Sequence, residues 1–276
     1  MPKTGQDGTL SPLLALLTGG WAMLLVTDVG NTTTVIGIFE GESLKAHWRL
    51  STTQRTSDEL GISLLTLLGT KGVAPEEIEG AAFASVVPMM DFSLREALRN
   101  FFNVEPLQVD ATIDTGMEIR YATPHELGAD RLVTAVAGRA KYGAPLIVAD
   151  YGTAITFDAV SPEGAYLGGA IAPGLNSSIS ALFSKAAKLP QVGLSLPKSV
   201  IGRNTNESIQ SGIVLGSAGL TDHIVGLLRA ELGMEAKVVA TGGHAGLMAR
   251  VSRTIDIVDP WLMLDGLRMI YQRVRG

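Results

Sequence analysis

Short apolar runs alternate along the chain with stretches in which apolar residues recur every three or four positions. The first pattern is typical of buried β-strands and the second of amphipathic helices. A hairpin turn is expected at Gly41 and Glu42, between the second and third apolar runs. In the first half the pattern predicts strands over residues 23–27, 33–40, 44–50, 80–87 and 107–109, and helices over 57–68, 75–78, 91–102 and 128–142.

The same order of elements starts again near residue 145. Here the pattern predicts strands over 145–149, 156–160 and 165–171, a strand over 237–241, an edge strand over 251–256, and helices over 176–188, 207–232 and 260–274. The two halves share this pattern but no long identical stretch. The repetition predicts an α/β fold of two duplicated lobes, with a ligand in the cleft at the carboxyl ends of the strands.

Each half places an aspartate, a glycine and several hydroxyl residues where its first strand ends. The two turns are Asp28-Val29-Gly30-Asn31-Thr32-Thr33-Thr34 and Asp150-Tyr151-Gly152-Thr153-Ala154-Ile155-Thr156. The aspartate can hold a cation or its water, and the glycine lets a phosphate approach the backbone without a Cβ in the way. The hydroxyl and backbone N–H groups can donate to phosphate oxygens. Used twice, this turn indicates a site for a nucleotide polyphosphate and its metal.

A single turn of this kind is weak as a functional signal, because Asp-Gly turns commonly end strands. The paired use of Asp28 and Asp150 favours the functional interpretation for both. A carboxylate with neighbouring carbonyl groups suits Mg²⁺ or a monovalent ion, and the residues alone do not choose between them.

A third motif, Tyr121 to Arg131, ends at the start of a predicted helix. Asp130 can simply cap or charge the first helical turn, where backbone N–H groups favour anions. Alternatively, Asp130 takes a proton from a substrate hydroxyl while Arg131 steadies an anion or the transferring phosphoryl group. In phosphoryl transfer the protein mostly positions groups and offsets charge, which suits the second interpretation.

Three further segments carry weaker signals. Thr241-Gly242-Gly243 follows a strand and allows a flat group such as a nucleobase to come close, and the turn from Gly168 to Gly174 can line the same cleft. Thr205, at the start of a predicted helix, either caps that helix or faces substrate.

The composition narrows the classes of protein. The chain has 276 residues, a net charge of −5, no cysteine and four scattered histidines. These numbers exclude thiol catalysis and Cys-ligated zinc, and they give no electrostatic footprint for nucleic acid. No apolar run reaches the roughly 20 residues that span a bilayer. Residues 1–22 are interpreted as an extension ahead of a natural start at Met23.

The ordered set D-x-G-N-T, P-x-x-L-G-A-D-R, D-x-G-T-A, G-G-A-I-x-P-G and T-G-G resembles type III pantothenate kinase. The likeness runs from about Met23 to the terminal helix. It implies the acetate and sugar kinase, chaperone ATPase and actin superfold, with two ribonuclease H-like lobes over residues 23–143 and 144–276, the last helix crossing back. It also implies a cytoplasmic homodimer that transfers the γ-phosphoryl group of ATP to pantothenate, the first step of coenzyme A biosynthesis.

The resemblance carries roles over to single residues. Asp130 is the proton acceptor, and the residues expected to contact pantothenate are Tyr121, Gly128, Ala129, Asp130, Arg131 and Thr205. Those expected to hold ATP are Asp28, Val29, Gly30, Asn31, Thr32, Thr33, Thr34, Val35 and Thr153. Asp28 is expected to bind Mg²⁺ through water, and Asp150 to bind potassium or ammonium. Part of the pantothenate site is expected to be completed across the dimer.

The chain departs from the family pattern at its N-terminal extension, at the variable position of His125 and at Ala186, where the family often has threonine. Two other functions remain open. One is a regulatory protein of the same fold, known among accessory factors for transcription, and the other is a kinase for a sugar or small acid. The intact set of acidic and hydroxyl residues favours an enzyme, and the position of the G-A-D-R segment favours pantothenate.

Overall fold

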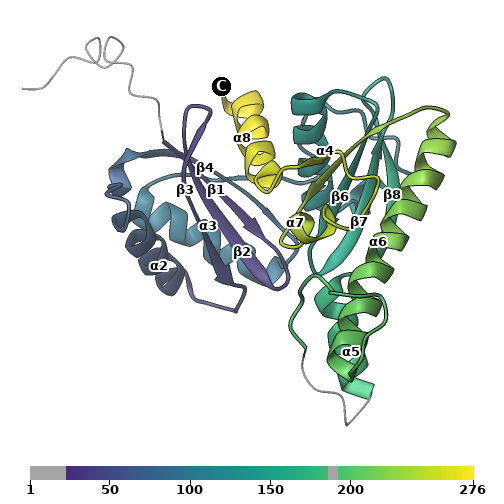
Figure 1. Cartoon of the computed structure of the whole chain (residues 1–276). Coiled ribbons are helices and arrows are strands. Elements are labelled where there is room, and N and C mark those ends of the chain that lie inside the picture. Colours follow the sequence, from purple (N-terminus) through teal and green to yellow (C-terminus); the bar gives the residue numbers. More distant parts are fainter. Residues whose placement is uncertain (1–22, 186–191) are drawn as a thin grey trace, which may run out of the picture.

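The structure, a computed structural model, describes residues 23–185 and 192–276, which form two five-stranded sheets with helices on their faces (Figure 1). The expectations for residues 1–22, for the end of the predicted 176–188 helix and for Ala186 lie outside these residues. His125, another position at which the chain departs from the family pattern, lies within the described residues, as do Thr123 and Pro124 before it.

The first sheet has the strand order β3-β2-β1-β4-β5. Two antiparallel pairs join β1 to β2 and β2 to β3, and parallel pairs join β1 to β4 and β4 to β5. A turn at Gly41, where φ is positive, connects β2 to β3 as expected. The strand bounds are β1 Met23–Val29, β2 Thr33–Glu40, β3 Ser43–Ser51, β4 Ile78–Ser85 and β5 Leu107–Gln108.

The second sheet repeats this topology, with the order β10-β9-β6-β7-β8. Its first three strands are again antiparallel neighbours, and β9 and β10 are again added in parallel. The bounds are β6 Leu146–Tyr151, β7 Ala154–Val160, β8 Tyr166–Pro173, β9 Lys237–Thr241 and β10 Ile257–Val258. The two sheets therefore confirm the predicted duplication and the α/β class.

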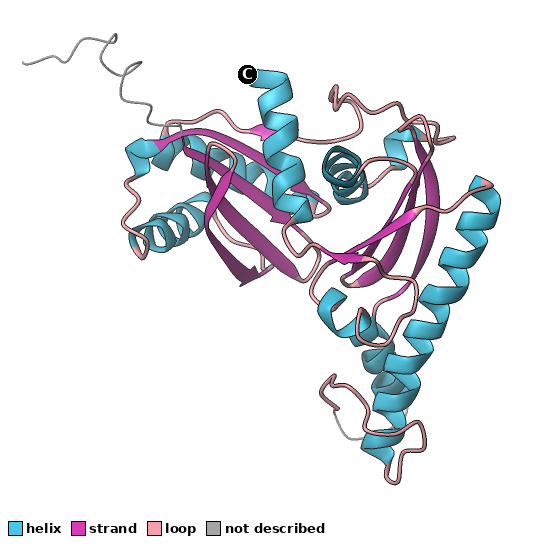
Figure 2. Cartoon of the chain, turned by 45° about the horizontal axis from the view of Figure 1, so that its top comes forward, coloured by secondary structure: helices cyan, strands magenta, loops and turns pink. Residues whose placement is uncertain are grey.

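The helices form outer layers and one inner layer. Helices α2 and α3 cover the outer face of the first sheet, α6 lies along the second, and α4 and α8 lie between the two sheets (Figure 2). One apolar core joins both sheets through α4 and α8. The bounds are α2 Ser57–Gly69, α3 Pro88–Phe102, α4 Ala129–Tyr142, α5 Leu175–Lys185, α6 Thr205–Leu232, α7 Ala245–Met248 and α8 Leu262–Arg275, with short 3₁₀ turns at Pro75–Glu77 and Pro124–Glu126.

Side chains cap two of the helices. Thr56 caps α2, because its hydroxyl accepts from the Glu59 N–H while the Glu59 carboxylate accepts from the Thr56 N–H. This reciprocal arrangement is a capping box. At α6 the cap is Asn204, so Thr205 is the first helical residue and does not cap the helix.

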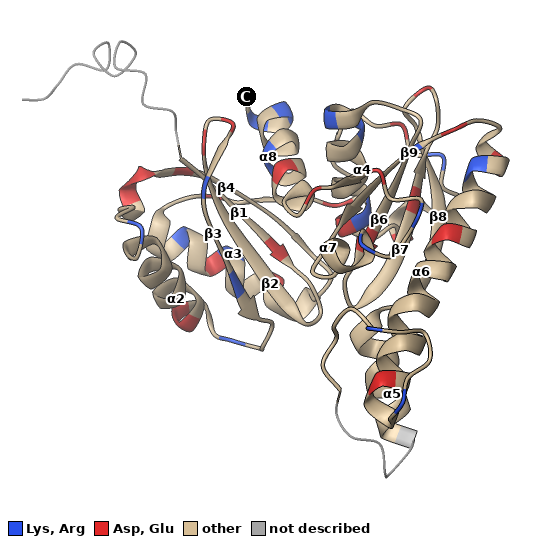
Figure 3. Cartoon of the chain, viewed as in Figure 1, with Lys and Arg blue, Asp and Glu red and all other residues tan. Residues whose placement is uncertain are grey.

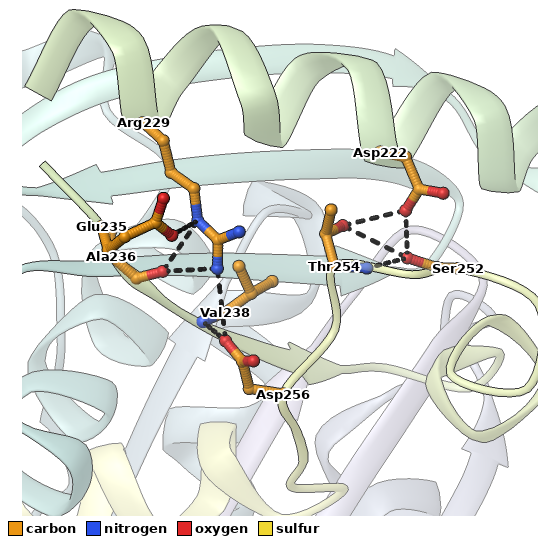
Figure 4. A network of polar contacts seen from close by, with 8 residues as sticks. All are labelled: Asp222, Arg229, Glu235, Ala236, Val238, Ser252, Thr254 and Asp256. Atoms are coloured by element: carbon orange, nitrogen blue, oxygen red, sulfur yellow. Dashed lines mark hydrogen bonds and ion pairs between the residues drawn. The ribbon is translucent and has the colours of Figure 1, made fainter.

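The predicted edge strand over 251–256 is wrong. The Asp222 carboxylate on α6 accepts hydrogen bonds from the hydroxyl groups of Ser252 and Thr254 (Figure 4). It also accepts one from the N–H of Arg253. Asp256 in turn accepts from the N–H of Val238 at the start of β9. Side chains therefore satisfy polar groups that a strand would pair with its neighbour, and strand pairing begins only at β10.

Among the described helices, α6 alone is long and apolar enough by length and composition to cross a membrane. It packs on β7, α5 and α7 of the folded second lobe. Within the lobe, Val214, Ala218, Thr221 and Val225 are buried on the side of α6 that faces its neighbours.

Candidate functional site

The two aspartate turns meet across the cleft. The Thr32 and Thr153 hydroxyl oxygens, one from each turn, lie 3.1 Å apart and share a hydrogen bond. In the first turn the Gly30 N–H donates to the Thr33 carbonyl, and in the second the Gly152 N–H donates to the Ala154 carbonyl. The two turns, one from each sheet, therefore lie in contact through their threonine hydroxyls.

The aspartates of the turns lie in an electrostatically unfavourable place. Burial raises the pKa of Asp28 well above its usual value, and the charges of Asp130 and Asp150 raise it further. Burial likewise raises the pKa of Asp150 to about 7, with Asp130 and Asp158 adding to the effect. The charges of Asp130 and Asp150 act on Asp28, so these three predicted carboxylates lie close together. They form one negative cluster that a cation would stabilise.

Thr52 holds the first turn in shape and was missed in the sequence. Its hydroxyl donates to the Gly30 carbonyl at 2.7 Å and lies 2.9 Å from the Thr34 hydroxyl. Its backbone N–H donates to the Thr32 carbonyl. Thr52 directly follows β3, so the third strand positions the turn that joins the first two.

The second turn is held from the other side by α5. The Ser177 hydroxyl donates to the Thr153 carbonyl at 2.6 Å, and the Gly174 N–H donates to the same oxygen at 3.1 Å. A Cβ on Gly174 would lie 2.4 Å from the carbonyl oxygens of Gly152 and Thr153. Glycine is therefore required for this close approach, which explains one glycine of the predicted 168–174 segment.

Asp130 lies in the first turn of α4, where one carboxylate oxygen accepts from the Arg131 N–H at 2.9 Å. The cap position itself belongs to Gly128. A Cβ on Gly128 would lie 2.5 Å from the Asp130 carboxylate, so glycine is needed for the carboxylate to take this position. The carboxylate therefore lies at the N-terminal, positive end of the α4 dipole.

Arg131 is held by a buried carboxylate that the sequence did not reveal. Its Nε donates to Asp158 Oδ1 at 2.8 Å, and its Nη2 lies 2.7 Å from the same oxygen. Tyr166 also donates to Asp158, at 2.7 Å, and its ring packs edge-on against Tyr121 with ring centroids 6.1 Å apart. Asp158 is fully buried and Arg131 is 9 % exposed, so this ion pair fixes the guanidinium of the residue that follows Asp130 in the chain.

Thr205 is the predicted site residue that the structure leaves apart. It lies at the exposed start of α6, beside α5 at the foot of the molecule, away from α4 (Figure 1). The Thr241-Gly242-Gly243 turn, by contrast, adjoins the cluster. A Cβ on Gly242 would lie 2.2 Å from Asp150 Oδ1, and its φ is 87°.

A divalent ion could take few protein ligands here. Within residues 23–185 and 192–276, no group of three or more His, Cys, Asp or Glu side chains is arranged to hold a metal. Mg²⁺ fits this set, since it usually binds one or two carboxylates together with substrate phosphates and water. Asp28 and Asp150 are the carboxylates that could hold cations.

The two duplicated lobes have the fold of the acetate and sugar kinase, chaperone ATPase and actin superfold. Solved structures share the fold. A protein from Campylobacter jejuni described as a Baf family transcriptional activator has a TM-score of 0.56 at 18% identity, covering 91% of this chain and 98% of that one. A protein from Listeria monocytogenes described as an N-acetylmannosamine kinase has a TM-score of 0.50 at 10% identity, covering 92% and 100%.

Sequence comparison identifies the family. A profile of the type III pantothenate kinase family matches residues 24–226. Type III pantothenate kinases from Anaeromyxobacter sp. and Myxococcus xanthus are 51% and 49% identical to this chain, covering 92% and 91% of it and 100% and 98% of their own lengths. The chain belongs to the type III pantothenate kinase family.

Proposed function

We propose that this protein transfers the γ-phosphoryl group of ATP to the terminal hydroxyl of pantothenate, giving 4'-phosphopantothenate in the first step of coenzyme A biosynthesis. Family membership supports the reaction. The observation that supports the proposed site is the hydrogen bond between Thr32 and Thr153, which joins the two aspartate turns. The charge of Asp130 also acts on both turn aspartates, Asp28 and Asp150.

Asp130 is assigned as the proton acceptor. The pantothenate hydroxyl oxygen attacks the γ-phosphorus, the bond to the β–γ bridging oxygen breaks, and ADP leaves with that electron pair. The hydroxyl proton passes to the Asp130 carboxylate. Arg131, fixed by Asp158, faces the developing negative charge, and Tyr121, Gly128 and Ala129 line the pantothenate side.

The first turn holds the ATP phosphates through its backbone N–H and hydroxyl groups, from Asp28 to Val35, and Thr153 adds a hydroxyl from the second lobe. Asp28 is assigned to Mg²⁺ through water, and Asp150 to potassium or ammonium. The negative cluster supports both assignments, because a cation would relieve the unfavourable burial of each carboxylate. When bound, the cations offset charge on the phosphates.

A homodimer would bring Thr205 to the pantothenate site of a second subunit. The support is the surface of α6, which carries few charges (Figure 3) and includes Gly212, Gly216, Gly219 and the exposed Leu227. The three glycines have open space where a Cβ would stand. Small residues of this kind let two helices approach closely. We also propose a cytoplasmic location and a boundary between the two lobes at residues 143 and 144.

The test is ATP-dependent phosphorylation of pantothenate, with and without potassium, beside the Asp130→Asn variant. Turnover should require potassium and fall by roughly 10²–10⁴-fold in the variant, while the unfolding temperature stays close to that of the wild type. Normal turnover in Asp130→Asn would refute the base. ATP binding without pantothenate phosphorylation would move the assignment to a regulatory protein or a kinase for another hydroxyl compound.

A further inference from the structure

We propose that Arg49, on the third strand of the first lobe, binds the phosphate chain of the nucleotide from the side opposite Gly242 and Gly243. The inference deepens the proposed nucleotide site and rests on ATP being the donor. No motif in the sequence points to Arg49, which lies in an ordinary-looking strand.

The register of the first sheet places Arg49 on the face that carries Asp28. Arg49 pairs with Val35 on β2, and Val35 pairs with Asp28 on β1. Residues directly paired across a sheet point to the same face. With strands 4.7–4.9 Å apart, the Arg49 and Asp28 backbones are separated by about 10 Å. That distance is about the reach of a triphosphate whose far end lies at Asp28.

Across the cleft, Arg49 reaches the second lobe. Its Nη1 lies 3.7 Å from the place where a Cβ on Gly243 would stand. Gly242, the preceding residue, comes so close to Asp150 that no side chain fits there. Arg49 therefore lies against the turn beside Asp150, one member of the negative cluster.

The guanidinium is held in place but keeps its charge uncompensated. It lies 6.0 Å from the centre of the Trp261 ring, which also packs against His47 with ring centroids 3.8 Å apart. The pKa of His47 is lowered by burial and by the charge of Arg49, which favours the neutral imidazole beside the guanidinium. In the described part of the chain no carboxylate forms an ion pair with Arg49, whereas Arg131 is already bound to Asp158.

A polyphosphate supplies the missing partner. Asp28, on the same sheet as Arg49, and Asp150, on the other sheet, carry carboxylates that repel phosphate unless cations intervene. A guanidinium binds phosphate oxygens through two parallel N–H donors, a geometry that lysine lacks. Arg49 thus gives the site a fixed positive charge of its own, contributed by the lobe opposite the nucleobase turn.

The alternative is that Arg49 only packs on Trp261 to join the lobes. ADP and adenosine separate the two, because adenosine shares the nucleoside but has no phosphate. Their affinities would be measured by calorimetry at fixed Mg²⁺ for wild type, Arg49→Gln and the control Arg99→Gln. Arg99 lies on the outer helix α3 and pairs with Glu96 and Glu105, so its loss changes the net charge equally without touching the cleft.

We expect Arg49→Gln to weaken ADP binding about tenfold or more, as for loss of a hydrogen bond to a charged group, and to leave adenosine binding and Arg99→Gln within about twofold of wild type. Unchanged ADP affinity, or equal losses for ADP and adenosine, would overturn the proposal. Should Arg49→Gln unfold, Arg49→Lys carries the test. It keeps the charge but not the fork, so ADP should weaken by about threefold and adenosine not at all, and equal weakening would again overturn it.

Phosphorylation of pantothenate by the wild-type protein is measured in parallel. If that activity is absent while ADP still binds in an Arg49-dependent way, the substrate assignment fails and the Arg49 assignment stands. If the activity is present and ADP binding does not depend on Arg49, the substrate assignment stands and the Arg49 assignment fails.

Discussion

The two lobes share a topology but differ at one equivalent position on their second strands. In the first sheet Val26 pairs with Gly37, and in the second sheet Val148 pairs with Asp158. Val26 and Val148 each lie two residues before the aspartate of their turn, so Gly37 and Asp158 occupy the same place on the face covered by the inner helices.

In the first lobe that place is apolar and tightly packed. A Cβ on Gly37 would lie 2.9 Å from Leu264 on α8 and 3.2 Å from Leu44 and Val26. The missing side chain lets α8 lie directly on the sheet, and burial of apolar surface stabilises the contact. No ionisable group takes part.

In the second lobe the same place holds the buried carboxylate of Asp158, which receives Arg131 from α4. A buried ion pair is weak as a source of stability, since desolvation of both ions offsets much of their attraction. The first lobe therefore uses this position for packing, and the second lobe uses it to fix a charged side chain at the candidate site.

The largest expected effect comes from Asp158→Asn. It leaves the Arg131 charge buried without an anion, which should lower the free energy of unfolding by about 3–5 kcal/mol and raise the KM for pantothenate more than that for ATP. Urea denaturation and steady-state kinetics measure the two effects. Glu118→Gln, which breaks the exposed pair with Arg120, should change stability by less than about 1 kcal/mol. Equal stability of both variants would contradict the role of Asp158.

Gly37→Ala should have a smaller effect, confined to stability. The added methyl meets Leu264, Leu44 and Val26, and overpacking of this kind lowers the free energy of unfolding by about 1–3 kcal/mol. Both KM values should stay unchanged. Gly69→Ala is the matched control, because nothing lies within 4 Å of its Cβ position. A rise in the KM for pantothenate with Gly37→Ala would show that this face also supports the site.

A further effect is a pH dependence from Asp150. Its folded pKa of about 7 lies above the value near 3.9 of an unfolded chain. Between these values the folded protein retains a proton that the unfolded chain has lost, so this carboxyl lowers stability as pH rises from about 4 to 7, with no further loss above. Asp150→Asn should therefore gain in unfolding temperature relative to wild type across that window, by about 2–4 °C for each kcal/mol relieved.

Potassium provides a second test of the role of Asp150. At pH 8 it should raise the unfolding temperature of the wild-type protein, because a bound cation offsets the ionised Asp150, and it should have little effect on Asp150→Asn. Thermal scans at pH 5 and pH 8, with sodium as the control ion, measure this. An equal response of the two proteins to potassium would place the cation elsewhere.

The parts of the candidate site that could be predicted are short motifs of a few consecutive residues. The two aspartate turns and the Asp130-Arg131 pair follow directly from a strand end or a helix start, where local pattern fixes the backbone. The sheets followed for the same reason, apart from the strand expected over 251–256. That segment has apolar residues in a strand-like pattern, but the Asp222 carboxylate on a distant helix takes up its N–H group.

The parts that could not be predicted depend on partners far along the chain. Asp158 lies 27 positions from Arg131, and Thr52 lies 22 positions from Gly30. Nothing adjacent to either residue marks it, because its chemistry arises only once strands and helices are packed. Arg49 is similar, since its position opposite Gly243 exists only in the closed pair of lobes.

The position of α8 has a consequence for synthesis of the chain. Leu264, Leu267 and Ile270 of this last helix lie in the core that includes Val26 and Phe39 of the first sheet. Domains generally fold as they leave the ribosome, N-terminal part first. Here one apolar face of the first sheet lacks the cover of α8 until that helix has been synthesised. A nascent chain stalled before Leu262 would therefore expose that face to chaperones, although every strand of its first sheet had already been made.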